Sequence, residues 1–197
     1  MTILPAQSLD GFFHEVVEDA IKTRRVDATD GATKYLVALL ADFAHPGKAT
    51  GGALERPMTL LLDEALHTPD RAERFERLRV LGDGVLYGCG FFGDHFESRG
   101  IDLGYLQGLG TRAYGAASSM LAQGDGPDLF GELADKFGVF VEVVGEVADA
   151  TIAMGTENPR GLLKVYERWL KTGSDRLASA LTSRGMMPTR NTRGVLQ

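Results

Sequence analysis

Hydrophobic residues along this chain recur mainly at intervals of three, four and seven positions, the spacing of amphipathic helices. We predict helices over about 9–21, 30–45, 58–66, 68–98, 102–123, 128–154 and 160–183. The alternation typical of strands is absent, and so are the repeats of roughly 34 or 40 residues that mark helical solenoids. The pattern predicts an all-α fold: a compact bundle of about six or seven helices with mainly antiparallel neighbours.

A chain of 197 residues has the length of one domain. We predict a single helical domain over 1–185 and a C-terminal tail over 186–197. The N-terminus lacks the pattern of a secretory signal, no stretch is apolar enough for a membrane span, and a single cysteine excludes an intramolecular disulfide. These observations favour a soluble, cytoplasmic protein.

The segment 128–154 follows a seven-residue period for nearly four heptads. Its predicted core seam consists of Phe130, Leu133, Phe137, Phe140, Val144, Val147 and Met154. Acidic residues recur at the same period on the opposite face, where we expect water: Asp128, Asp135, Glu142 and Asp149.

Glycine is unusually frequent, with 25 residues, about twice the share expected from an average usage of roughly 7%. Fifteen of them fall between Gly82 and Gly145, many at helical steps of four and seven. Each glycine inside a helix costs roughly 1 kcal/mol relative to alanine, so some favourable contact must offset that cost. We predict close packing of helices along glycine-lined faces, with a ligand-binding shelf as the alternative.

The ligand alternative places a haem or another small hydrophobic ligand beside the glycine-rich helix 82–93, without specifying the cofactor. Its candidate residues are Gly84, Gly88, Cys89, Phe92 and His95. A haem needs an axial ligand, commonly histidine. His95 is one candidate, and His14 with Glu18 one turn later is another.

Sequence motifs for nucleotide binding, metal binding and nucleophilic catalysis are incomplete or absent. Two matches to the dinucleotide fingerprint, beginning at Gly88 and Gly108, lack the preceding strand that the fingerprint requires. A di-iron carboxylate site is a third hypothesis, based on Glu64-Ala-Leu-His67 and the poorer match Asp42-Phe-Ala-His45. No nucleophile elbow, phosphate-binding loop or zinc-protease motif is present. We therefore assign no catalytic residue and no metal ligand.

Charge is distributed unevenly. Residues 158–197 contain eight basic and two acidic residues, a net charge of +6, whereas 1–157 contain 13 basic and 25 acidic residues, a net charge of −12. A basic stripe runs along the last predicted helix: Arg160, Lys164, Arg168 and Lys171. Three roles fit this stripe: pairing with the acidic stripe inside the fold, docking on a partner protein or a second copy, and binding nucleic acid or anionic lipid, of which we favour the first two together. A pI near 5.2 disfavours nucleic acid. The leading hypothesis is protein–protein interaction or regulation, as a homodimer.

Overall fold

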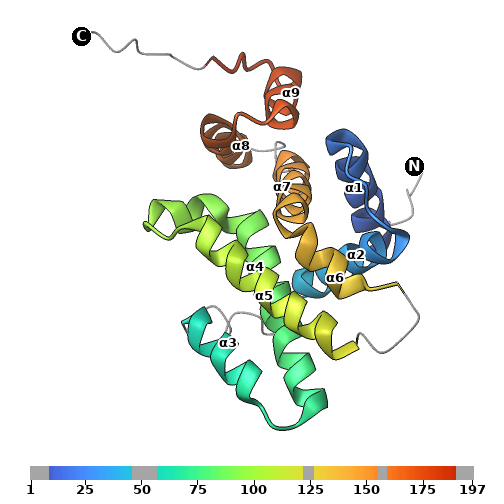
Figure 1. Ribbon diagram of the computed structural model, residues 1–197. Helices are drawn as coiled ribbons and strands as arrows, with labels where there is room; N and C mark the ends of the chain where they lie inside the picture. The colour runs from blue at the N-terminus through green and yellow to red at the C-terminus, as the bar shows by residue number, and fades with distance from the viewer. Residues whose placement is uncertain (1–8, 46–56, 122–126, 155–158, 190–197) are drawn as a thin grey trace. The chain divides into compact units, whose positions relative to one another are not determined.

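The computed structural model describes residues 9–45, 57–121, 127–154 and 159–189. Within these ranges it contains nine α-helices and no strand (Figure 1). The helices are α1 (Leu9–Arg24), α2 (Asp30–Ala44), α3 (Met58–His67), α4 (Arg71–Ser98), α5 (Leu103–Leu121), α6 (Leu129–Asp135), α7 (Phe137–Ala153), α8 (Pro159–Thr172) and α9 (Asp175–Ser183). The predicted all-α class is therefore confirmed.

Two predicted helices are each divided in two, which is why the described residues form nine helices rather than six or seven. The segment 128–154 breaks at Lys136, whose φ of −104° and ψ of 20° end α6. The segment 160–183 breaks at Gly173, whose φ of +67° favours glycine. Hydrophobic periodicity indicates which face of a helix is buried and is insensitive to one or two non-helical residues. The predicted antiparallel arrangement stays a prediction.

The chain divides into two compact units, Met1–Gly145 and Glu146–Gln197, and the division falls within α7. The single domain predicted for 1–185 stays a prediction. Of the predicted tail, 190–197 lie outside the described residues.

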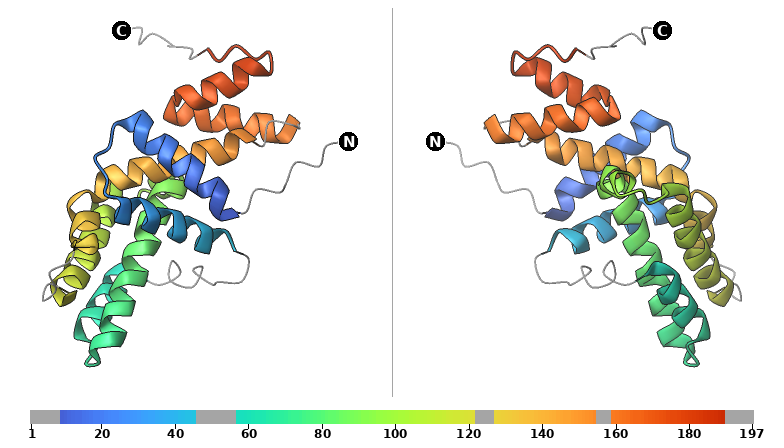
Figure 2. Two further views of the ribbon diagram at one scale, coloured as in Figure 1. Left: turned by 90° about the vertical axis from the view of Figure 1, so that its right-hand side faces the viewer. Right: turned by 90° about the vertical axis from the view of Figure 1, so that its left-hand side faces the viewer.

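In the first unit, α4 is packed along α5, and α3 lies alongside α4 (Figure 2). Further packed pairs are α5 with α6 and α1 with α2. Helix α4 begins where the carboxylate of Asp70 accepts a hydrogen bond from the backbone N–H of Glu73, a standard N-cap. Its Leu78, Val85 and Leu86 are fully buried. The core of the first unit therefore runs along α4.

Several glycines in this unit leave space for a neighbouring side chain. A Cβ added at Gly82 would lie 2.5 Å from Cε1 of Tyr114, and one at Gly110 would lie 2.5 Å from Cε2 of Phe137. Val144 occupies the equivalent space beside Gly90. The predicted close packing is therefore present at these three glycines, with side chains rather than backbone filling the space.

In the second unit, α8 and α9 pack around a small apolar cluster. Its buried members are Val165, Trp169, Leu177 and Leu181. Two come from each helix, and the left-handed Gly173 reverses the chain between them.

No helix in the described part of the chain is both long enough and apolar enough to cross a membrane.

The contact at Gly110 predicts a stability difference between two alanine variants of α5. Gly110→Ala should lower the free energy of unfolding by about 1–3 kcal/mol, because the buried ring of Phe137 must shift. Gly108→Ala is the matched control: its Cβ meets nothing within 4 Å, and it should raise stability by up to about 1 kcal/mol. Urea denaturation measures both, and equal effects would contradict the packing described.

Candidate functional site

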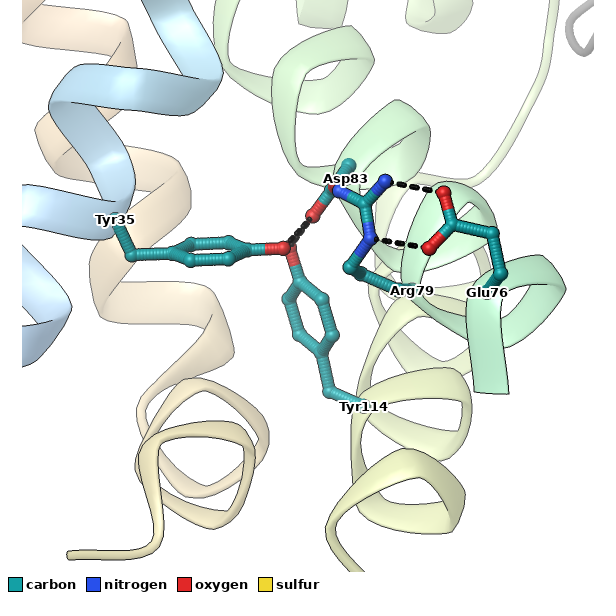
Figure 3. Close-up of polar contacts among 5 residues, drawn as sticks. All are labelled: Tyr35, Glu76, Arg79, Asp83 and Tyr114. Atoms are coloured by element: carbon teal, nitrogen blue, oxygen red, sulfur yellow. Dashed lines mark hydrogen bonds and ion pairs between the residues drawn. The ribbon is translucent and has the colours of Figure 1, made fainter. Parts of the chain in front are cut away.

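The candidate site is built around a buried carboxylate. Asp83 is the only charged residue between Val80 and Gly93, and it is only 7% exposed. A buried charge is tolerated when hydrogen bonds and an opposite charge compensate it. The hydroxyls of Tyr35 and Tyr114 both donate to Oδ1 of Asp83, at 2.6 and 2.7 Å (Figure 3). Nη1 of Arg79 donates to Oδ2 at 2.7 Å.

Arg79 also binds a second carboxylate. Its Nε and Nη2 donate to Oε2 and Oε1 of Glu76, at 3.0 and 2.5 Å (Figure 3). Glu76, Arg79 and Asp83 follow one another at steps of three and four along α4, so the helix itself brings the three groups together. The guanidinium is thus shared between an exposed carboxylate and a buried one.

Packing holds the two tyrosines in place. Phe130, from α6, makes an edge-on contact with Tyr35 and a tilted one with Tyr114, at centroid distances of 5.6 and 5.8 Å. Gly82 provides the space for the ring of Tyr114, which is completely buried. Side chains from α2 and α5 therefore converge on one oxygen atom of an α4 residue.

Burial dominates the electrostatics of this network. Loss of hydration raises the pKa of the Asp83 carboxyl, although the two hydroxyls and Arg79 act in the opposite direction. Burial also raises the pKa of Tyr35 and of Tyr114 above their ordinary values. Both tyrosines therefore stay protonated at neutral pH and serve as hydrogen-bond donors.

The network borders a cavity of about 290 Å³ between α2 and α4. The lining residues are Tyr35, Ala38, Leu39, Asp42, Phe43, Arg79, Val80 and Asp83. Leu39, Phe43 and Val80 supply apolar surface. The ring of Phe43 is stacked on Tyr87 of α4, with centroids 4.1 Å apart, so its position is fixed from outside the cavity.

The five ligand-binding residues predicted from the sequence do not line this cavity, and their role stays a prediction. Gly84 and Gly88 are buried in α4, and a Cβ added at Gly84 would have no atom within 4 Å beyond its chain neighbours and the nearby backbone of its own helix. Cys89 is buried, and burial raises the pKa of its thiol to about 12, which makes it a poor nucleophile. Phe92 is 45% exposed, and His95 is exposed.

The backbone of Phe92 departs from helical values, with φ of −122° and ψ of 18°, so α4 is kinked there. Both fingerprint-like glycine motifs lie inside helices, the first in α4 and the second in α5. Neither has the strand that a dinucleotide site requires.

The other histidine candidates lie at helix surfaces. Nδ1 of His14 is 3.8 Å from Oε1 of Glu18, and both side chains are substantially exposed. Nδ1 of His67 contacts the backbone oxygen of Asp63 within its own helix. Among the described residues, no group of three or more His, Cys, Asp and Glu side chains is arranged to hold a metal ion.

The sequence predicts that the acidic stripe of 128–154 faces water throughout, and this prediction is wrong at one residue. Asp149 is buried, and its Oδ1 accepts a hydrogen bond from Nε of Arg168 at 2.9 Å, with side-chain exposures of 7% and 14%. One member of the predicted basic stripe thus pairs within its own unit. Its other members, Arg160, Lys164 and Lys171, are exposed.

Comparison of the chain with protein-family models, with curated proteins and with solved structures finds no match.

Sequence reasoning missed Tyr35, Asp83 and Tyr114. One signal was present: an isolated acid in a glycine-rich apolar run, spaced for pairing with Arg79, indicates a buried charge that needs donors. The tyrosine donors gave no such signal, because they lie 48 and 31 residues from Asp83.

The raised pKa of Asp83 predicts a specific pH dependence of stability. The folded chain holds this proton more tightly than the unfolded chain, where the ordinary value is 3.8, so protonation favours folding. The contribution of Asp83 is therefore greatest below pH 3.8 and falls as the pH rises through the folded-state pKa.

Asp83→Asn removes this titration, so the stability of the wild type minus that of the variant should fall as the pH rises above 3.8. Denaturant unfolding of both proteins at each pH measures the difference. A difference that is constant or rises with pH would contradict the electrostatics described.

Proposed function

We propose that the protein binds a small amphipathic molecule in the cavity between α2 and α4. The observation that carries this proposal is a buried, ion-paired carboxylate whose residue also lines a partly apolar cavity. A polar network that serves stability alone needs no opening. Here Asp83 and Arg79 face the same space as Leu39 and Phe43.

The size and composition of the cavity support the proposal. Its volume of about 290 Å³ is just below the range of about 300–1,000 Å³ found for ligand pockets. Ligand pockets combine apolar walls with a few convergent polar groups, and titratable residues with shifted pKa values concentrate in them. The cavity suits a ligand with an apolar part and one polar group.

A cavity-filling substitution tests this proposal. Ala38 is exposed and lines the cavity, so Ala38→Trp should occupy the space with little effect on folding. Ala44, also exposed on α2 but outside the cavity lining, provides the matched control Ala44→Trp. A library of small amphipathic compounds is screened by ¹H–¹⁵N NMR, with shifts mapped onto cavity residues.

We expect compounds that shift Tyr35, Leu39 and Asp83 in the wild type, with affinity lost by at least tenfold in Ala38→Trp and kept in Ala44→Trp. Screening hits that bind Ala38→Trp equally well, or the absence of any compound that shifts cavity residues, would contradict the proposal.

Self-association is the second candidate function, favoured by the exposed side of α8. Leu163 and Leu170, seven residues apart, are 56% and 44% exposed. Lys164 and Lys171 follow them at the same spacing. The proposed partner is a second copy of the chain, whose residues 1–157 carry a net charge of −12. Regulation through this contact and a cytoplasmic location stay predictions.

Two sets of substitutions on α8 separate a docking role from a structural one. Replacing both Lys164 and Lys171 by glutamate should weaken self-association, measured by analytical ultracentrifugation, without changing stability. Arg168→Ala should lower the free energy of unfolding by about 3–5 kcal/mol, because it leaves the buried Asp149 unpaired. If the wild type is monomeric at high concentration, the self-association proposal is wrong.

A further inference from the structure

The cavity wall carries more acidic than basic side chains. The charged lining residues are Asp42, Arg79 and Asp83. Arg79, the cation among the described lining residues, already donates three hydrogen bonds, two to Glu76 and one to Asp83. Within the described residues, two carboxylates, those of Glu76 and Asp83, share this single guanidinium. The resulting negative potential favours a ligand that carries positive charge.

The carboxylate of Asp83 has the capacity to accept one more donor. A carboxylate offers about four acceptor positions. Among the described residues, both tyrosine hydroxyls use Oδ1, and Arg79 uses one position on Oδ2. A further N–H on Oδ2 would make a charge-assisted hydrogen bond, which is stronger than a neutral one.

An anionic ligand fits less well. A guanidinium has five N–H groups, so Arg79 keeps two beyond its three donations. An anion using them would, however, lie close to the carboxylates of Glu76 and Asp83, both within hydrogen-bond distance of the same guanidinium. Like charges so placed repel strongly where the surroundings are desolvated.

The rest of the wall suits an apolar group next to a cation. Leu39 and Val80 are aliphatic, and Phe43 presents an aromatic ring. An aromatic ring attracts a nearby cation electrostatically and also packs against alkyl groups. An amine with a short alkyl or aryl group would use both properties.

We propose that the cavity is selective for a small primary amine, whose ammonium group donates to Asp83 and whose apolar part lies against Leu39, Phe43 and Val80. This inference rests on the binding function proposed above and adds the charge of the ligand.

The test compares three ligands of equal chain length: hexylamine, hexan-1-ol and hexanoate, titrated into the ¹⁵N-labelled full chain at neutral pH. We expect hexylamine to bind about tenfold more tightly than hexan-1-ol, and hexanoate to bind most weakly. Asp83→Asn should abolish the preference for the amine over the alcohol.

Two further variants keep the test decisive if Asp83→Asn fails to fold. Asp42→Asn removes an exposed cavity carboxylate and should lower hexylamine affinity several-fold while leaving hexan-1-ol affinity unchanged. Asp135→Asn, which removes an exposed carboxylate outside the cavity lining, is the matched control and should change neither affinity.

The outcomes separate this inference from the proposal on which it rests. If all three ligands shift cavity residues with equal affinity, or if hexanoate binds most tightly, the cavity binds small molecules and the charge inference is wrong. If none of them shifts cavity residues and the wider screen also finds no ligand, both proposals fail.

Discussion

The carboxylate of Asp83 is the constraint around which the first unit is organised. Removing an ionised carboxylate from water is expensive unless donors and an opposite charge replace the lost hydration. Three donors from three helices do so here: Tyr35 from α2, Arg79 from α4 and Tyr114 from α5. The relative positions of these helices are thereby fixed to within hydrogen-bonding tolerance. The same constraint explains the glycine at position 82, since a larger residue would displace the ring of Tyr114.

The second unit also contains a buried carboxylate, which is compensated by a single charged partner in the contacts described. Asp149 is also buried, and the guanidinium of Arg168 lies against it. In this unit the charged partner comes from a helix that follows closely in the chain, 19 residues away. The neighbouring Val165 and Trp169 are buried in the apolar cluster of α8 and α9, so the position of Arg168 depends on that packing. The two buried acids therefore differ in how much of the chain must fold before each is compensated.

Sequence patterns predicted the helices well because burial of one face leaves a strong periodic signal. Seven predicted segments correspond to the nine helices of the described residues, and the two divisions occur where one or two residues leave helical geometry. The acidic stripe of 128–154 shows what hydrophobic periodicity does not predict. Its period is real, yet Asp149 is buried while Glu142 is exposed and pairs with Arg24. Periodicity does not identify which neighbour covers a given face.

Most of the candidate site could not be predicted from the sequence, for a related reason. The Glu76–Arg79–Asp83 series is local and can be read from helical spacing. Tyr35 and Tyr114 reach Asp83 only through tertiary packing, and the cavity lies between helices that are separated by α3 in the chain. The glycine-rich run 82–93 lies on the same helix, α4, as Arg79 and Asp83. The chemistry, however, lies on the side of α4 that carries Arg79 and Asp83, rather than near Gly88 and His95.

The sharing of one oxygen atom by Tyr35 and Tyr114 also has a consequence for the order of folding. The Glu76–Arg79 pair can form within one turn of α4, before any other helix packs against it. Asp83 must keep its hydration shell until contacts spanning 48 and 31 residues have closed. Such non-local contacts form late, since chain entropy is lost before they contribute. Full dehydration of this single carboxylate therefore requires α2, α4 and α5 to be packed together already.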